Sequence, residues 1–367
     1  MGEEGIGIAA GSLLLYNLFD VAWEIDLHRI ERRLAESKRL TIDRKHFSKA
    51  FEFANPPVSL ALKPLEKNIG GALYRVNAYA RVYDYGVLSI IFEVPLSGLA
   101  LWQIERLSRE IERTKPFGED FKREVGLLAN VLKDEITGLN IGRFEEDYAI
   151  YYVKKTAPSL NAEDFLKQYD LSSLLLYEEG GEQPGRNIAK ELLYNSFSYS
   201  EGDLVVINWD NAFVLEPSGS MDIPDLIEYA NAQLLELRVY DNMLDRELEA
   251  IYGRIAPKGT LPLWHIKKYE ELAAKVMRTV TELTEITEKI DNSVKVTEDV
   301  YYARVYDTAL RLFKVKQWEG SIRRKLDVAS RVYQMLYQEI ANKRTEFLEI
   351  VIVLLIALEI ILALLRQ

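Results

Sequence analysis

The chain has 367 residues, of which 28% are charged, and its formal net charge is −11. This acidic balance argues against a nucleic-acid binder, which needs a basic face to release phosphate counterions, and against a soluble part that lies flat on anionic lipid. The chain contains no cysteine, so disulfides and thiolate chemistry are excluded.

The first 220 residues predict a mixed α/β head. The opening Met1-Gly2-Glu3-Glu4 lacks the basic segment of a secretory signal peptide, so none is expected. Residues 12–21 predict a strand and residues 25–34 a helix. A short strand follows at 58–62, after the break Asn55-Pro56-Pro57.

The clearest strand signal is an alternation of residue types between positions 72 and 83. One face carries Tyr74, Val76, Ala78, Ala80 and Val82, and the other carries Arg75, Asn77, Tyr79 and Arg81. This alternation predicts a half-buried strand. Asp84-Tyr85-Gly86 then supplies a turn, and residues 87–94 predict the antiparallel partner strand.

Helices and strands continue to interleave up to residue 220. Helical patterns cover residues 99–113 and 117–137, a strand begins at Tyr148, and residues 203–209 and 212–216 predict a hairpin. No glycine-rich phosphate loop lies between these elements, which favours an α+β class over a doubly wound nucleotide fold. The head has two candidate subdomains, residues 1–140 and 141–220.

From Asp225 onwards the sequence predicts almost only helix, arranged as an antiparallel coiled-coil stalk over residues 221–346. Asp222 is the expected cap of a first helix that ends near Ile255, and a second helix begins near Trp264. A third helix runs without proline from Glu298, with Gly320 as its one weak point. Apolar residues recur at alternating intervals of three and four, which is typical of a coiled-coil seam. The seam of the second and third helices comprises Val276, Val280, Leu283, Ile322, Leu326, Ala329, Tyr333, Leu336 and Ile340.

Residues 347–365, FLEIVIVLLIALEIILALL, predict one transmembrane helix. A helix of this length spans about 28 Å, close to the hydrocarbon thickness of a bilayer. Lys343 and Arg344 precede it and only Arg366 follows it, so the positive-inside rule places the N-terminal bulk in the cytoplasm or its organellar equivalent. The seam continues in register to Phe347, so stalk and membrane helix are expected to be one helix.

Three segments resemble the required-for-meiotic-nuclear-division (Rmd) family. They are VYDYGVLSIIFEVPL (82–96), the helical tract from Val300 through KLDVASRVYQMLYQEI, and the ending RTEFLEIVIVLLIALEIIL (344–362), in which Glu359 is the second acid. Members of that family pair an α/β domain with a helical region and one C-terminal membrane helix. Eukaryotic members sit at the mitochondrial inner membrane and support organellar translation. The resemblance therefore implies a tethering role and no established enzymatic activity.

The progression from helical stalk to membrane is also similar to CorA-type magnesium channels. Those channels have two membrane helices joined by a Gly-Met-Asn loop. This sequence has one such helix and no such tripeptide, which argues against a channel of that type.

Phe347, Glu349 and Glu359 are the candidate contact residues of the membrane segment. Glu349 lies near the interface, where a carboxylate can reach water. Glu359 lies about 10 Å of helix before Arg366, and an ionised acid near mid-bilayer costs about 2.5–3.5 kcal/mol, so it should be protonated or face another helix. A contact within an oligomer, a tolerated protonated acid, and a proton or ion path are the three open interpretations.

A second group of candidates is polar. Glu236, Arg238, Asp241 and Asp245 lie on one predicted helix at neighbour spacing, which indicates either ion pairing between stalk helices or a binding groove. The acidic pair Asp134-Glu135 is expected to be a solvated face. The histidines, His28, His46 and His265, lack the spacing of metal ligands. No metal, other cofactor or catalytic residue is predicted.

These observations favour a membrane-tethered, homo-oligomeric scaffold or interaction protein. Its expected partners are the lipid bilayer, further copies of itself and an unidentified protein. Two alternatives stay open: an oligomeric permeation or sensing element that uses Glu359, and an enzyme with an unrecognised site in the head.

Overall fold

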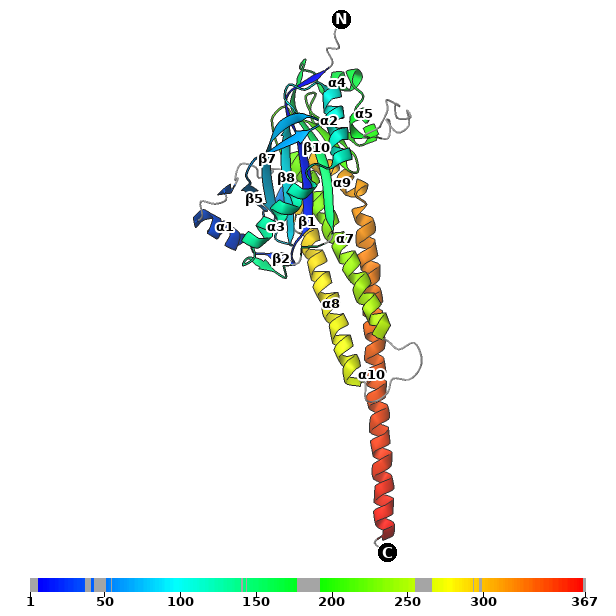
Figure 1. Ribbon diagram of the computed structural model, residues 1–367. Helices are drawn as coiled ribbons and strands as arrows, with labels where there is room; N and C mark the ends of the chain where they lie inside the picture. Colours follow the sequence, from blue (N-terminus) through cyan, green and yellow to red (C-terminus); the bar gives the residue numbers. More distant parts are fainter. Residues whose placement is uncertain are drawn as a thin grey trace. The chain divides into compact units, whose positions relative to one another are not determined.

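The computed structural model describes residues 6–36, 41–42, 51–53, 55–139, 141–142, 144–176, 192–254, 266–292, 294–296 and 299–365. The chain forms two compact units. The first comprises Met1–Glu236 and Ile290–Lys316, and the second comprises Leu237–Lys289 and Gln317–Gln367. The expected α+β class is confirmed, because a mixed sheet precedes helices that end in a long apolar helix (Figure 1).

The first unit is built on a ten-stranded sheet with strand order β11-β12-β13-β10-β1-β8-β7-β5-β3, and β6 pairs with β7 off this path. β10 and β13 pair in parallel, and the other described pairs are antiparallel. The strand bounds are β1 Gly7–Asp20, β3 Thr41–Ile42, β5 Val58–Ala61, β6 Leu65–Ile69, β7 Ala72–Val82, β8 Val87–Pro95, β10 Glu145–Ala157, β11 Ser196–Phe197, β12 Leu204–Ile207 and β13 Asn211–Leu215. Two small ribbons add β2 (Glu24–Ile25) with β9 (Ile136–Thr137), and β4 (Phe51–Phe53) with β14 (Val294–Val296).

β1 is the central strand of this sheet, between β8 and β10 (Figure 1). Leu15, for example, lies opposite Phe92 on one side and Ala149 on the other. The strand begins at Gly7, five residues before the expected start at Ser12. Its apolar run LLLYNLF is buried on both faces, which is typical of a strand covered by other elements on both sides.

One face of the sheet packs against α2 (Leu101–Thr114), α3 (Gly118–Val131), α4 (Ala162–Gln168) and α5 (Ser172–Leu175). Phe92 of β8 lies 4.4 Å from Phe121 of α3, and Phe165 of α4 stacks on Phe213 of β13 at 5.1 Å, measured between ring centroids. A short helix, α1 (Leu27–Glu36), adds Leu27 and Ile30 to the same core. These contacts form the large apolar core of the unit.

The opposite face packs against the first half of α7 (Asp222–Arg254) and against α9 (Val300–Leu312). Tyr229 of α7 lies 6.4 Å from Tyr83, and Phe313, just after α9, lies 5.5 Å from Tyr148 of β10. The prediction of a half-buried strand is confirmed, because Val76, Ala78, Ala80 and Val82 are buried and Arg75 is exposed, but the Arg81 side chain on the polar face is only 11% exposed. The cause is α7, which covers the polar face of the strand at that point.

The second unit comprises the remainder of α7, together with most of α8 (Ile266–Asn292) and most of α10 (Val315–Leu365). Its apolar cluster is made by Leu272, Ala273, Val276, Ala329, Val332, Leu336 and Ile340, with Leu248, Val280, Val328 and Tyr333 packed against them. Six of the predicted seam residues of these helices thus lie in or against one cluster, among them Val276 and Leu336. Among the other seam residues, Ile322 and Leu283 are buried and Leu326 is half-buried.

The expectation of an unbroken third helix is wrong. α9 ends at Leu312 and α10 begins at Val315, because Lys314 adopts the left-handed conformation with φ of 57°. The amide of Lys314 still donates to the carbonyl of Arg311, as in a helix end. Gly320, the expected weak point, lies inside α10 without interrupting it.

The turn between β7 and β8 leads to a stability prediction. Gly86 has φ of +99°, and a Cβ built on it would lie 1.8 Å from the carbonyl oxygen of Ala22. Gly98 has φ of +85° and nothing within 4 Å of such a Cβ. Gly98→Ala should therefore cost about 1–2 kcal/mol of unfolding free energy from backbone strain alone, and Gly86→Ala more than about 4 kcal/mol because the backbones must also separate.

Urea unfolding of the detergent-solubilised protein, with hydrogen exchange of β7 and β8, would measure both substitutions. Similar losses for Gly86→Ala and Gly98→Ala would contradict the close contact with Ala22.

Candidate functional site

The last part of α10 leaves the packed cluster of the second unit. Phe347 is 51% exposed and Leu365 is 77% exposed, and the apolar side chains between them are exposed as well, except for the half-buried Val351. Within the described residues, α10 is the one helix long and apolar enough to cross a membrane. Glu349 and Glu359 lie exposed in this segment, which makes them accessible to lipid or to another protein chain.

The predicted polar tract on α7 divides between the two units. Glu236 is buried in the first unit, whereas Asp241 and Asp245 belong to the second. There the ammonium of Lys325 on α10 lies 2.8 Å from Asp241 and 2.6 Å from Asp245, and the hydroxyl of Ser321 donates to Asp241. These contacts are ion pairs between helices. Burial lowers the pKa of Arg238 in the same tract.

A buried ionic cluster joins the sheet to α7 in the first unit. The Arg81 guanidinium donates to Asp225 through Nη2 and to Glu228 through Nη1, both at 2.5 Å. Asp225 and Glu228 lie three residues apart, so they share one face at the start of the helix. The Glu228 side chain is 0% exposed. One cation here faces two carboxylates inside the protein.

Burial and neighbouring charge shift the titration of this cluster. Burial raises the pKa of Asp225 to about 7, although the Arg81 charge opposes that shift. Burial alone would lower the pKa of Arg81, but the two carboxylates outweigh it and raise that pKa further above its ordinary range. Burial and the Glu228 charge raise the pKa values of Tyr16 and Tyr83, which keeps both phenols neutral.

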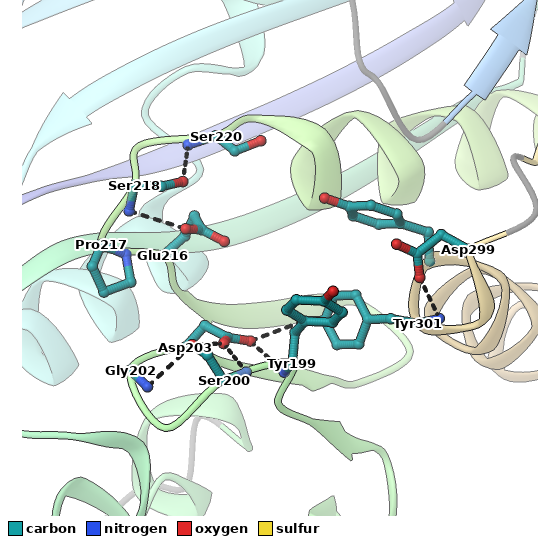
Figure 2. A pocket seen from close by; sticks show the side chains of 11 residues that line it. Tyr199, Ser200, Gly202, Asp203, Glu216, Pro217, Ser218, Ser220, Asp299 and Tyr301 are labelled. Carbon is teal, nitrogen blue, oxygen red and sulfur yellow. Dashed lines mark hydrogen bonds between the residues drawn. The ribbon is translucent and has the colours of Figure 1, made fainter.

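A separate cavity of about 560 Å³ lies in the first unit where three connections meet (Figure 2). The turn before β12 contributes Tyr199 and Asp203, the loop between β13 and α7 contributes Glu216, and the start of α9 contributes Asp299 and the Tyr301–Tyr302 pair. Its volume falls within the range of about 300–1,000 Å³ that is usual for small-molecule sites. The cavity is thus large enough for a ligand and combines aromatic with acidic walls.

Asp203 holds the wall of this cavity in place. Its carboxylate accepts hydrogen bonds from the amide of Tyr199 at 2.7 Å, from the amide and hydroxyl of Ser200 at 2.5 Å, and from the phenol of Tyr301 at 3.3 Å. Four donors fill the acceptor positions of one carboxylate. Asp203 therefore positions Tyr301 and the turn and has no remaining capacity for a ligand.

The other two carboxylates are less fully bonded. The Oε1 of Glu216 accepts from the Ser218 amide at 3.0 Å, and the Oδ1 of Asp299 caps α9 by accepting from the Tyr301 amide at 2.9 Å. Each of these hydrogen bonds uses one of the two carboxylate oxygens. Beside them, the phenol of Tyr302 donates to Asp222 at 3.0 Å. Burial first, then nearby carboxylates, raise the pKa values of Tyr301 and Tyr302.

The structure describes no grouping of three or more His, Cys, Asp or Glu side chains suited to a metal ion. His28 lies exposed on α1, while His46 and His265 fall outside the described residues.

Sequence reasoning missed both internal sites. Arg81 was assigned to a solvated strand face, but the i, i+3 pair of acids at 225 and 228 in an otherwise apolar helix start was a signal for a buried cation nearby. Asp203 was recognised only as the start of a hairpin. Glu135, expected on a solvated face, is instead buried and lies 3.0 Å from Arg33.

Comparison with known proteins identifies a family and a relative. The family described as "Uncharacterized protein MJ0711, N-terminal domain" matches residues 10–222. The uncharacterised protein MJ0711 of Methanocaldococcus jannaschii is 28% identical over 226 residues, which cover 61% of this chain and 68% of the relative. No solved structure matches the chain. The matched region contains Arg81 and the turn before β12, and it ends where α7 begins.

The ionic cluster leads to a pH prediction. Between pH 4 and 7 the native Asp225 binds a proton that the unfolded chain, with the ordinary pKa of 3.8, has already released. Stability from this group should therefore fall as the pH rises through that window, by up to about 1.4 kcal/mol per pH unit, and stay level above it. Asp225→Asn should remove that slope.

Urea unfolding at a series of pH values from 4 to 8 would test this. The pKa values of Asp20 and Asp210 are also raised, to about 7 and about 6, mainly by burial, so they add slopes of the same sign that persist in the variant. The exposed Asp134→Asn is the matched control and should leave the profile unchanged. Equal slopes for the native protein and Asp225→Asn would refute the assignment.

Proposed function

The chain belongs to the MJ0711 N-terminal domain family, and on this premise we propose that it is a membrane-tethered scaffold that acts as a homo-oligomer and presents its head to a protein partner. The observation that carries the proposal is α10. One helix supplies Leu336 and Ile340 to the packed cluster of the second unit and then continues as an exposed apolar segment to Leu365. The packed unit and the candidate membrane span are therefore parts of the same helix.

The charge distribution along α10 supports an orientation. Arg323, Arg324, Lys325, Arg331, Lys343 and Arg344 precede the apolar segment, and Arg366 follows it. Basic residues near the end of a membrane helix favour the cytoplasmic side. The proposal therefore places both compact units in the cytoplasm or its organellar equivalent.

The second unit offers a surface for another copy of the chain. A groove of about 690 Å³ lies between α8 and α10, lined by Ala273, Met277, Tyr333, Tyr337 and Ile340 with Arg278 and Arg344 among its other residues. Met277 is 47% exposed, Tyr337 is 62% exposed, and Tyr333 and Tyr337 stack with ring centroids 6.2 Å apart. Membrane anchoring would hold the copies parallel, so that the groove of each copy lies at the same distance from the membrane.

The resemblance to the Rmd family supports the tethering part of this proposal by analogy. It adds no residue that carries out chemistry, so the scaffold proposal rests on the helix and groove above.

Removal of residues 347–365 should release the protein from membranes, because the exposed apolar segment would be lost while the packed cluster of the second unit is kept. Fractionation of cell membranes after a carbonate wash would measure the change. The full chain should stay in the pellet, and the shortened chain should appear in the supernatant. A shortened chain that remains in the pellet would contradict a single anchor.

Glu359→Gln should weaken self-association if the acid contacts a neighbouring copy within the membrane, whereas Glu349→Gln, at the interface, is the matched control and should change little. Mass photometry and chemical cross-linking of the detergent-solubilised protein would measure the oligomer. We expect a loss of about 1 kcal/mol or less per contact for Glu359→Gln.

A native protein that is strictly monomeric and captures no partner from membranes would refute the scaffold proposal. Ion flux into liposomes that disappears in Glu359→Gln would instead favour the permeation alternative.

A further inference from the structure

We propose that the cavity of Figure 2 binds an organic cation through an ammonium group. This inference goes beyond the scaffold proposal, because it assigns a ligand class to a site in the head that neither membrane anchoring nor self-association uses. It rests on three properties of the cavity: the charge of its walls, the bonding left open on its carboxylates, and its aromatic rings.

The charge of the lining is uniformly negative. Asp203, Glu216 and Asp299 line the cavity, and no lysine, arginine or histidine is among its described lining residues. Lys154 of β10 places its Cε 3.9 Å from a Cβ built on Gly219 and its ammonium 5.6 Å from the ring centroid of Tyr152. Lys154 does not line the cavity, so the walls favour a positively charged guest.

Two of the three carboxylates can accept from that guest. Asp203 is fully occupied by its four donors, whereas the hydrogen bonds of Glu216 and Asp299 each use one oxygen. These two acids come from opposite walls in Figure 2, one from the loop before α7 and one from the start of α9. An ammonium group carries three donors and can bond to an open oxygen on either acid.

The third property separates an organic ammonium from a hydrated metal ion. Tyr301 packs against Tyr199 and against Tyr302 in edge-to-face geometry, with ring centroids 5.4 Å apart in each pair. Tyrosine faces attract alkylammonium groups and contact their carbon chains, but they offer a hydrated metal ion little. Because Asp203 and Asp222 accept from the phenols of Tyr301 and Tyr302, the rings are held in place before any ligand arrives.

Isothermal titration calorimetry of the full chain in detergent would test the site with defined probes. Butylammonium, spermidine and the blocked tripeptide acetyl-Ala-Lys-Ala-amide, whose one ammonium is the lysine side chain, all carry the proposed group, and 1-butanol is the neutral isostere of the first. We expect saturable binding of at least one ammonium probe and none of 1-butanol. Binding of the tripeptide alone would identify a lysine side chain of a protein partner as the source, and binding of the free amines would identify a metabolite.

Substitutions then locate the binding. Glu216→Gln and Asp299→Asn should each lower the affinity for the ammonium probe about tenfold or more, since each removes a charged acceptor. Both substitutions keep the shape of the side chain, and Asn at 299 keeps the helix cap. Tyr302→Leu should lower this affinity as well, because it removes an aromatic ring from the cavity wall. Glu201→Gln is the matched control, because Glu201 is exposed in the same turn and does not line the cavity, so its affinity should stay within twofold.

The proposal is overturned if no ammonium probe binds saturably, if 1-butanol binds as tightly as butylammonium, or if Glu201→Gln loses as much affinity as Glu216→Gln. Hydrogen exchange of β12 and β13 would show that each variant keeps its fold. Oligomer mass measured on the same samples keeps the two proposals separate. A monomer that binds the probe refutes only the scaffold, and an oligomer that does not bind it refutes only this site.

Discussion

The ion pairs between Arg81 and the first turns of α7 are the interaction on which the head depends. If either partner were lost, the charge of the other would remain buried between the sheet and α7 without an opposite charge beside it. Breaking such a buried pair typically costs about 3–5 kcal/mol, because the remaining charge is left without a partner. The pairs also fix the rotation of α7 about its axis, since Asp225 and Glu228 must both face β7. Tyr229 is thereby directed to Tyr83 and to Tyr306 of α9.

That fixed helix organises the cavity as well. The loop that carries Glu216 ends at the start of α7, and Asp222 in the first turn accepts from Tyr302 of α9. Gln233, about three turns further along, accepts from the phenol of Tyr306. α7 and α9 are therefore joined by tyrosine hydroxyls on one side of the sheet. The cavity occupies the end of this layer, where the two helices begin.

Local sequence patterns predicted much of this structure. Three patterns can be recognised from a short stretch of sequence by their periodicity or length, and each corresponds to an observed element. They are the alternation in 72–83, the hairpin at 203–216 and the apolar run at 347–365. The helix break at Lys314 left no such trace, because a lysine in the left-handed conformation has no distinctive sequence signal. The burial of Arg81 depends on α7, which lies more than a hundred residues later in the chain, so strand periodicity could not reveal it.

The same distance explains why the candidate sites were only partly predicted. Asp241 and Asp245 were recognised from helical spacing, but their partner Lys325 lies on another helix. The cavity collects Asp203, Glu216 and Asp299 from three connections, and no spacing rule links them. Glu359 is the opposite case, since an acid inside an apolar run is conspicuous in the sequence alone, whereas its role depends on neighbours beyond a single chain.

The reliance of one buried cation on two acids limits how this protein can change over evolutionary time. Arg81 lies within the region shared with the MJ0711 family, whereas Asp225 and Glu228 lie just beyond it. Replacement of Arg81 alone would leave two buried acids without a cation, and replacement of the acids alone would leave the buried guanidinium without a carboxylate. A change at Arg81 should therefore be accompanied by changes at Asp225 and Glu228, because a buried charge left without its partner is destabilising.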